Sequence, residues 1–423
     1  MKKHFIVLVT SLFLFACGNG ENNSSGPQES LIIGGKSGNE LAENQIFRKN
    51  NGSDPGTLDP HRAEGVPASN VLRDLYEGLV SEAANGDYIP GAAEAWTISE
   101  DGKTYRFKIR ENAVWSNGDK VTAEDFVFSL RRSVDPITLS NYSSMLYPIK
   151  NARDVVLGKI KPDELGVYSE GEKELVVELE EPTPYFISLL THSTTYPVHP
   201  PSVRQHGAFF TRPENMISNG AFVLKDWRVQ DYISLGRNGK YWDDKNTTLN
   251  EVYYYPLDNP DASLRRYRAN ELDFTDTTPS EQLPWIKKNL KDELKITPYF
   301  GSYYYGFNTT KPPFKNNLNL RMALSLAVNR TIITEKVLGA GQIPALTFVP
   351  PVKAYEGIQP EWAQINQEER EVLASDFYSK AGYSDSNPLK IEIIYNTSEN
   401  HKRVALAVAS MWKTVLGLSL IHI

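Results

Sequence analysis

Apolar residues recur with two different periods after position 31, and this mixture constrains the fold more than any other feature of the sequence. One set has the spacing of a single helix face and predicts an amphipathic helix over residues 70–80: Val71, Leu72, Leu75 and Leu79. A second set alternates with charged residues, as in a half-buried strand: Tyr105, Phe107 and Ile109. Helix and strand patterns interleave without a fixed repeat, which favours a mixed α/β fold over a solenoid.

Local signals place further elements along the chain. Residues 100–103 predict a tight turn before the strand at 105–109. Thr122 is followed by acidic residues that suit the start of a helix, and Pro136 marks its end. The spacing of apolar residues also predicts two strands and two helices, around 175–179, 391–395, 320–328 and 331–338.

Length and charge limit the classes of function. A chain of 423 residues corresponds to two or three structural units, at about 150 residues per domain. The 45 basic and 52 acidic residues give a formal net charge of −7. A surface of that charge has no electrostatic reason to bind nucleic acid or an anionic bilayer, so we expect neither as a partner.

The first residues have the pattern of an export signal. Lys2 and Lys3 precede the apolar run 5–16, which is too short to span a bilayer and predicts a signal peptide over 1–16. The run leads into Leu-Phe-Ala-Cys, which resembles a bacterial lipobox and predicts a lipid on Cys17. Phe15 departs from the small residue usual there, so simple secretion stays an alternative. Residues 17–30 are polar and are expected to form a disordered tether.

No motif in the sequence supports catalysis or a cofactor. The glycines before Lys36 suggest a phosphate loop, but Ser30 stands where that motif needs its first glycine. Cys17 is the only cysteine, and neither a zinc-protease nor a nucleophile-elbow motif is present. The histidines at 192, 199 and 206 define no common face, so a loop or surface role is favoured over a metal site. We therefore expect no enzyme, no cofactor and no metal.

Several separate blocks resemble the oligopeptide-binding proteins of the family-5 solute-binding group. The most specific block runs from 93 to 126 and includes Trp96, the turn at 100–103, the segment Trp-Ser-Asn-Gly-Asp at 115–119 and the helix start at 121–126. Further matches lie at 57–67, 218–221, 266–268, 303–314 and 395–401. Together these blocks cover nearly the whole chain after the tether.

The resemblance implies a two-lobed fold of the periplasmic-binding-protein type II, with a cleft that closes over the ligand. Lobe one would consist of 31–76 and 201–299, with an inserted domain over 77–200, and lobe two would span 300–423. The family pattern continues past the equivalent of Gly417, whereas 418–423 depart from it and have the appearance of an artefact. We therefore expect lobe two to be incomplete and to lack the aspartate that clamps the ligand's amino terminus.

The resemblance also implies a function, that of an extracytoplasmic component of an ABC importer that captures short peptides. Two segments would pair with the peptide backbone: Glu64-Gly65-Val66 and Gly301-Ser302-Tyr303. Five further positions would contact the ligand: Tyr142, Thr277, Tyr299, Tyr304 and His401. The partners would be the permease and ATPase subunits, with the membrane reached only through the lipid, and the protein would be a monomer in the periplasm or cell envelope.

Several alternatives remain open at these positions. A run of tyrosines in a strand usually alternates between core and surface, and only the family match favours Tyr304 as ligand-facing. Thr277 and Gly301 stand where some relatives carry asparagine and cysteine, and Trp96 and Trp115 are expected to be structural. The same fold serves nickel complexes, haem, sugars and murein peptides in other relatives. A role as a chaperone or peptide sensor fits the same residues, and a secreted hydrolase has no motif to support it.

Overall fold

The computed structural model describes residues 41–297, 299, 301–350, 357–384 and 386–418. The predicted signal peptide, the tether with Cys17 and residues 419–423 lie outside the described residues. None of the described helices has the length and apolar character that crossing a membrane requires.

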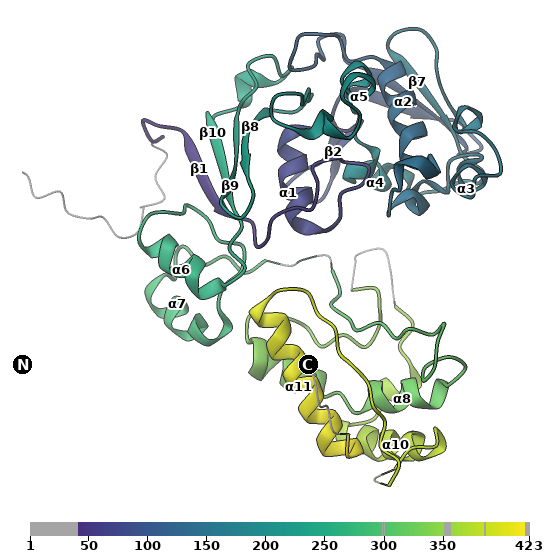
Figure 1. Ribbon diagram of the computed structural model, residues 1–423, viewed down its shortest axis with the longest axis vertical. Coiled ribbons are helices and arrows are strands. Elements are labelled where there is room, and N and C mark those ends of the chain that lie inside the picture. The colour runs from purple at the N-terminus through teal and green to yellow at the C-terminus, as the bar shows by residue number, and fades with distance from the viewer. Residues whose placement is uncertain (1–40, 298, 300, 351–356, 385, 419–423) are drawn as a thin grey trace, which may run out of the picture. The chain divides into compact units, whose positions relative to one another are not determined.

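The first sheet has the strand order β1-β10-β9-β8 (Figure 1). Its strands are β1 (Ile46–Asn50), β8 (Phe222–Arg228), β9 (Tyr232–Arg237) and β10 (Glu251–Tyr255). β1 is parallel to β10 and the other pairs are antiparallel. Helix α1 (Gly65–Leu75) packs against β8 with a buried face formed by Ala68, Val71, Leu72 and Leu75.

The second sheet is wholly antiparallel, with the order β4-β5-β7-β6. Its strands are β4 (Ala93–Ile98), β5 (Thr104–Ile109), β6 (Val167–Ser169) and β7 (Glu174–Glu178), and a separate hairpin consists of β2 (Val80–Glu82) and β3 (Tyr88–Pro90). The predicted turn at 100–103 joins β4 to β5, and Tyr105, Phe107 and Ile109 are buried as expected. Helix α2 (Ala123–Val134) packs against β6 and β7.

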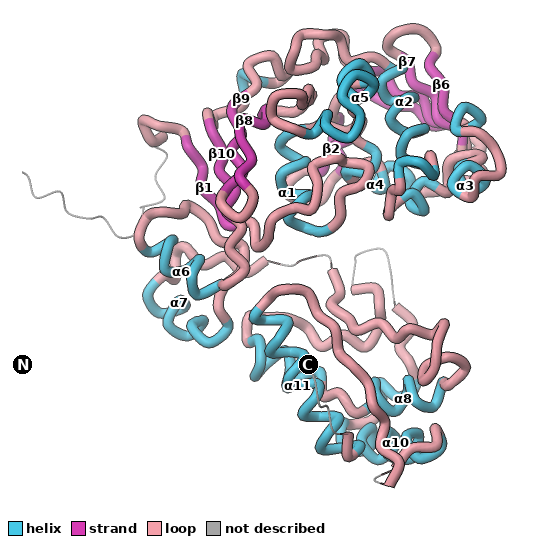
Figure 2. Tube along the Cα trace, viewed as in Figure 1, coloured by secondary structure: helices cyan, strands magenta, loops and turns pink. Residues whose placement is uncertain are grey.

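The remaining helices are distributed along the chain (Figure 2). Those before residue 300 are α3 (Ala152–Val156), α4 (Phe186–Leu189), α5 (Pro200–His206), α6 (Pro260–Arg268) and α7 (Leu283–Asn289). Those after it are α8 (Leu318–Leu326), α9 (Arg330–Ile332), α10 (Gln367–Lys380) and α11 (Glu399–Leu416). A π-helical turn over Ile333–Leu338 follows α9, so the predicted helix at 331–338 begins as an α-helix and ends with a wider winding.

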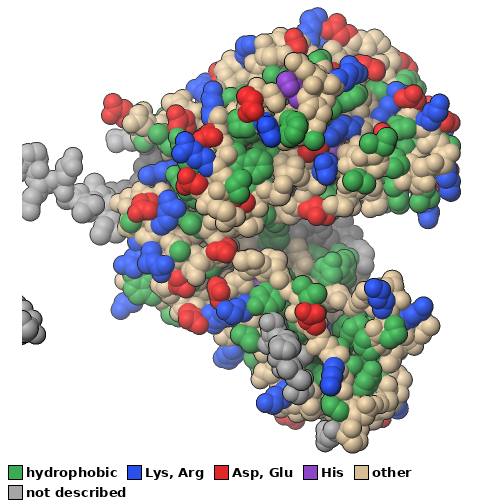
Figure 3. All heavy atoms as spheres, viewed as in Figure 1, with side chains coloured by type: hydrophobic (Ala, Val, Ile, Leu, Met, Phe, Trp, Pro, Cys, Tyr) green, Lys and Arg blue, Asp and Glu red, His purple; other side chains and the backbone are tan. Residues whose placement is uncertain are grey.

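The described residues contain two separate hydrophobic cores. The first is formed by buried residues between Leu58 and Tyr254, and the second by buried residues between Leu320 and Leu418. In the second core α10 packs against both α8 and α11, and Trp412 donates its indole hydrogen to the carbonyl of Leu324 at 2.8 Å. On the face visible in Figure 3, basic and acidic side chains are interspersed among the described residues.

Two elements differ from the sequence-based expectation. Helix α1 begins five residues before the predicted start and ends at Leu75, because the backbone of Tyr76 is extended. Leu79 is buried but lies outside the helix. The expected strand over 391–395 is not assigned: Ile393 is buried and Ile394 exposed, as in a strand, but these residues form no ladder with another described segment.

A buried ion pair connects the segment before α1 to helix α2. Arg132 contacts both carboxylate oxygens of Asp59, at 2.9 and 2.6 Å, and also lies 2.8 Å from His61 Nδ1. His61 Nε2 lies 2.9 Å from the carbonyl of Tyr196, so the imidazole accepts from Arg132 and donates to that carbonyl. Burial, with a further contribution from the Arg132 charge, lowers the pKa of His61 to about 4.

We expect the neutral His61 to lose its contribution to the stability of this first core in acid. Its pKa lies below the 6.5 of a free imidazole, so between pH 6.5 and about 4 the unfolded chain binds the extra proton. This contribution to the free energy of unfolding should therefore decrease by about 3 kcal/mol as the pH falls through that window. Burial raises the pKa of Glu77 to about 7, and that group acts in the opposite direction over much of the same range. Urea unfolding across this pH range therefore compares the protein with His61→Gln, whose free energy of unfolding should rise by about 3 kcal/mol relative to that of the unsubstituted protein as the pH falls.

The half-exposed His206 provides the matched control, since no hydrogen bond or ion pair holds its side chain among the described residues. His206→Gln should leave the pH dependence unchanged. If both substitutions changed the pH dependence of the free energy of unfolding equally, the effect would not arise from the buried imidazole.

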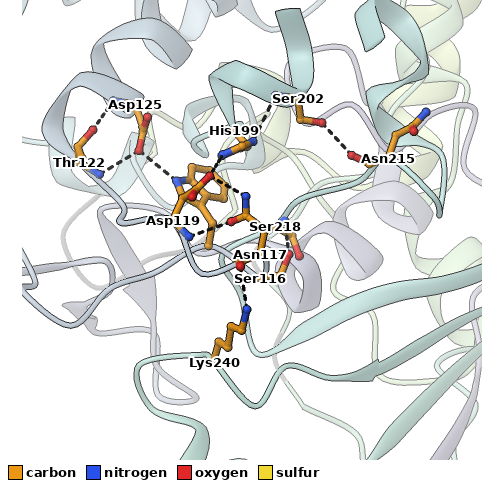
Figure 4. Close-up of polar contacts among 11 residues, drawn as sticks. Ser116, Asn117, Asp119, Thr122, Asp125, His199, Ser202, Asn215, Ser218 and Lys240 are labelled. Atoms are coloured by element: carbon orange, nitrogen blue, oxygen red, sulfur yellow. Dashed lines mark hydrogen bonds and ion pairs between the residues drawn. The ribbon is translucent and has the colours of Figure 1, made fainter. Parts of the chain in front are cut away.

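The signature segment 115–125 forms a polar network (Figure 4). Trp115 is fully buried and donates from Nε1 to Asp125 at 3.0 Å, and the same carboxylate accepts from the backbone of Thr122 at 2.9 Å. The Thr122 hydroxyl accepts from the backbone of Asp125 in return, which completes the predicted capping box of α2. Trp115 is therefore structural, as expected.

The network extends to the start of α5 through His199. Its Nε2 lies 3.0 Å from the carboxylate of Asp119, and its Nδ1 accepts from the backbone of Ser202 at 3.2 Å, so the histidine caps that helix as a neutral ring. Asn117 and Lys240 bind the same loop, since Asn117 donates to Asp119 and Lys240 donates to the carbonyl of Asn117. These contacts tie the signature to residues far along the chain.

We expect Asp125→Ala to lower the free energy of unfolding of this region by about 2–4 kcal/mol. The substitution leaves the buried Trp115 indole and the backbone amide of Thr122 without their acceptor. The control is Glu124→Ala, which removes the exposed neighbouring acid and should cost no more than about 1 kcal/mol. Chemical denaturation of both variants tests this prediction. Equal losses in the free energy of unfolding would contradict a structural role for the half-buried Asp125 carboxylate.

Candidate functional site

The first predicted ligand segment lies at the start of α1. Glu64 is exposed and has an extended backbone, with φ of −129° and ψ of 149°. Gly65 has a φ of +80°, a conformation that other residues rarely adopt. Val66 is 55% exposed and lies in the first turn of the helix. Only Glu64 therefore has strand-like backbone, which restricts the pairing that this segment can offer.

Two further predicted positions lie elsewhere in the first part of the chain. Tyr142 precedes a short 3-10 turn, and its ring contacts that of His192 edge to face at 4.9 Å. Thr277 lies in the loop after α6 and accepts from the hydroxyl of Thr275 through its carbonyl oxygen at 3.0 Å. Among the described residues, no hydrogen bond or ring contact joins either side chain to Glu64, Gly65 or Val66.

The remaining predicted residues lie in the second part of the chain, on a segment with exposed aromatic rings. Tyr299 is 80%, Tyr304 61% and Tyr303 48% exposed. A Cβ atom on Gly301 would lie 2.5 Å from the Tyr299 ring, so a cysteine here would require that ring to move. Among the described residues, the backbone of 302–307 forms no hydrogen bond with another backbone group. This segment therefore presents free donors and acceptors together with aromatic surface.

The tyrosine run alternates between two faces. Tyr303 and Tyr305 share one face, with ring centres 5.7 Å apart, and Tyr305 packs against the second core. Tyr304 points the other way and contacts Phe348 edge to face at 4.9 Å. Phe348 is 68% exposed, so this pair forms an aromatic surface that the sequence pattern did not reveal.

His401 is joined to the Tyr303 face. The two rings lie 4.6 Å apart, and His401 stands in the first turn of α11, where its backbone donates to the hydroxyl of Ser398 at 3.3 Å. Its Nδ1 is hydrogen-bonded to Asn396 Oδ1, which leaves Nε2 without a protein partner among the described residues. Burial lowers the pKa of His401, so the ring is neutral near pH 7 and Nε2 can accept a hydrogen bond.

The other histidines and acids of the described residues form no cluster that could hold a metal ion. No group of three or more potential ligands is close enough to hold a metal ion in the part of the chain that the structure describes. His192 accepts from the backbone of Thr194 at 3.2 Å, and His199 lies in the loop before α5, where it is buried in the signature network, so both histidines lie in loops as expected. Asn396 belongs to one of the sequence blocks that resemble the family. Its contact with His401 could not be predicted from the sequence, because it depends on how the loop folds.

Comparison with known proteins identifies the family. Residues 87–420 match the model of the bacterial extracellular solute-binding proteins, family 5 middle. The chain is 42% identical to the periplasmic oligopeptide-binding protein OppA of Salmonella typhimurium, over 90% of this chain and 71% of that protein. It is 43% identical to a periplasmic protein of Escherichia coli, YgiS, named as a probable deoxycholate-binding protein, over 89% of this chain and 70% of that protein.

Solved structures agree with this assignment. The Haemophilus influenzae OppA complex with the peptide RPPGFSPFR superposes with a TM-score of 0.86 at 42% identity, covering 91% of this chain and 76% of that one. The murein tripeptide binding protein MppA of Escherichia coli superposes with a TM-score of 0.87 at 39% identity, covering 90% and 75%. The chain therefore belongs to family 5 of the bacterial extracellular solute-binding proteins, a family of binding proteins and not of enzymes.

Proposed function

We propose that this protein is the extracytoplasmic component of an ABC importer and that it captures short peptides. The observation that carries the proposal is the segment 302–307, whose backbone groups have no backbone partner among the described residues and whose neighbours are exposed tyrosines. An extended peptide added alongside such a segment gains main-chain hydrogen bonds without any requirement for particular side chains. The peptide-bound relative supports the same ligand class.

The proposed contacts divide between the two parts of the chain. Glu64, Gly65, Val66, Tyr142 and Thr277 contribute from the first, and the second contributes the rest: Tyr299, Gly301, Ser302, Tyr303, Tyr304 and His401. His401 accepts a ligand N–H or, when protonated, pairs with a ligand carboxylate. Tyr304, with Phe348, lines the space for a side chain.

The proposed architecture is a two-lobed binding protein of type II. Lobe one consists of 31–76 and 201–299, the inserted domain of 77–200, and lobe two starts at 300. Two hydrophobic cores without a shared residue support separate lobes. The first core contains residues from both sheets, which supports the attachment of the inserted domain to lobe one.

The proposed location is the periplasm or cell envelope. Periplasmic relatives support export, and the sequence Leu-Phe-Ala-Cys at 14–17 motivates a lipid on Cys17. The partners are then the permease and ATPase subunits of the importer, and the membrane is reached only through the lipid.

A second candidate ligand has an observation in its favour. The relative named as a probable deoxycholate-binding protein is as similar to this chain as the oligopeptide-binding protein is. The exposed Tyr304–Phe348 pair offers apolar aromatic surface for a sterol-like ring system. Peptide is preferred because an apolar ligand leaves the backbone groups of 302–307 unused.

We expect isothermal titration to detect saturable binding of tri-alanine, tri-leucine and tri-lysine with affinities within about tenfold of one another, since the backbone supplies most contacts. N-acetylated tri-alanine and sodium deoxycholate are titrated in parallel. Equal affinity for tri-alanine and its acetylated form would exclude an anchor at the amino terminus. Binding of deoxycholate without binding of any peptide would overturn the proposal.

Substitutions at the aromatic segment should weaken peptide binding. Tyr304→Ala and His401→Ala each remove a proposed contact and should raise the Kd for tri-alanine by about fivefold to fiftyfold. The matched control is Tyr88→Ala, which truncates a 46%-exposed tyrosine on β3, outside the proposed site. Titration of the three variants checks this, and the same loss in all of them would indicate a general loss of folded protein.

A further inference from the structure

A cavity of about 490 Å³ lies among residues that have no place in the proposed peptide site. Its walls come from the end of α1, the hairpin strand β2, the turn before α5 and the loop after β9, and they include Arg73, Glu77, Glu82, Tyr196 and Tyr241. This volume is within the range of small-molecule sites in proteins. All of these segments lie before residue 300, and Tyr76 and Tyr196 also belong to the first hydrophobic core.

Glycines allow the walls of this cavity to approach closely. A Cβ atom on Gly220 would lie 2.6 Å from the backbone carbon of Leu75, and one on Gly78 would lie 3.0 Å from the Tyr196 ring. Because the first contact is with backbone, a larger residue at 220 cannot be accommodated by a side-chain movement. The cavity therefore has a fixed floor where α1 ends.

Three ionisable side chains line this space, and none of them forms an ion pair among the described residues. Among the described residues, Arg73 and Glu82 form no hydrogen bond or ion pair through their side chains, and both are exposed at the cavity. Glu77 is buried and accepts from the Tyr241 hydroxyl and from Trp242 Nε1, the latter at 2.7 Å, but it has no cation within ion-pair distance. Burial raises the pKa of Glu77 to about 7, and these two hydrogen bonds and the charge of Arg110 oppose the shift.

The Tyr196 hydroxyl lies between these charges. Burial raises the pKa of Tyr196 to about 12, opposed by the Arg73 charge and increased by Glu77 and Glu82, so all three groups act on one hydroxyl. The ring is held in place because this hydroxyl donates to the carbonyl of Thr191 at 3.1 Å. The cavity thus has one basic and two acidic side chains near a fixed aromatic ring.

We propose that this cavity is a second ligand site, separate from the peptide site, and that it binds a free α-amino acid. The ligand ammonium group would face Glu77 and Glu82, and its carboxylate would face Arg73. A side chain then lies against the Tyr196 ring and the small residues Ala83 and Ala84. Arg73 lies in the last turn of α1, where the helix dipole alone favours a cation. This role of Arg73 does not account for Glu77 and Glu82, which would still lack a cationic partner.

Ligand-observed NMR titration of the full chain tests this site with L-leucine, N-acetyl-L-leucine and L-leucine methyl ester. L-leucine should bind saturably, and removing either ligand charge should weaken binding about tenfold or more. Arg73→Gln should weaken L-leucine by a similar factor and leave the methyl ester unchanged, because that ester has no carboxylate to lose. Glu82→Gln should weaken L-leucine and leave the N-acetyl compound unchanged.

The controls separate this site from the peptide site. Arg62→Gln and Glu100→Gln replace exposed residues away from the cavity and should have no effect. Saturating tri-alanine should not displace L-leucine, and His401→Ala should not weaken it. Equal affinities for the three compounds, or no binding of L-leucine up to about 10 mM, would overturn the second site and leave the peptide proposal intact. Loss of L-leucine binding in His401→Ala would place the amino acid in the peptide site instead.

Discussion

The buried contact between Arg132 and Asp59 sets the arrangement of everything around the start of α1. The two residues are 73 positions apart, and their pair joins the segment before α1 to α2. Removing two charges from water is costly, and the double hydrogen bond, the contact of Arg132 with the His61 ring and the hydrogen bond from the His61 backbone amide to Asp59 offset that cost. The nearby Tyr76 hydroxyl is buried and has no hydrogen-bond partner in the described part of the chain, a further penalty that this junction tolerates. Glu64 and Gly65 follow the junction directly, so their position depends on it.

Regular elements with a local cause could be predicted from the sequence. The alternation at 105–109 and the capping residues at 122–125 each act through neighbours a few positions away, and both features are present in the structure. The start of α1 was harder to predict, because Gly65 has a left-handed backbone and the spacing of apolar side chains does not indicate such a conformation. The strand expected at 391–395 has the correct alternation, but a strand also needs a hydrogen-bonded neighbour, and alternation does not supply one.

The candidate site could be placed by resemblance, but its contacts could not. The block containing Asn396 and His401 marked the region, yet the ring contact with Tyr303 joins residues almost a hundred positions apart. Phe348 lies in a stretch without any motif, and its role depends on the face to which Tyr304 points. The charged cavity is hidden from sequence reasoning for the same reason, since its walls come from four separate parts of the chain. Such sites arise from tertiary packing, which leaves no short-range signature.

The unpaired backbone of 302–307 has a consequence for ligand length. In the proposed site, a bound peptide exchanges hydration for hydrogen bonds, so each bond contributes only about 1 kcal/mol net. Association itself costs about 4 kcal/mol or more in lost freedom of movement. A single amino acid cannot form enough of these bonds to offset that cost, whereas each added residue brings new ones. We therefore expect the proposed pairing at this segment to favour longer peptides, without selection among their side chains.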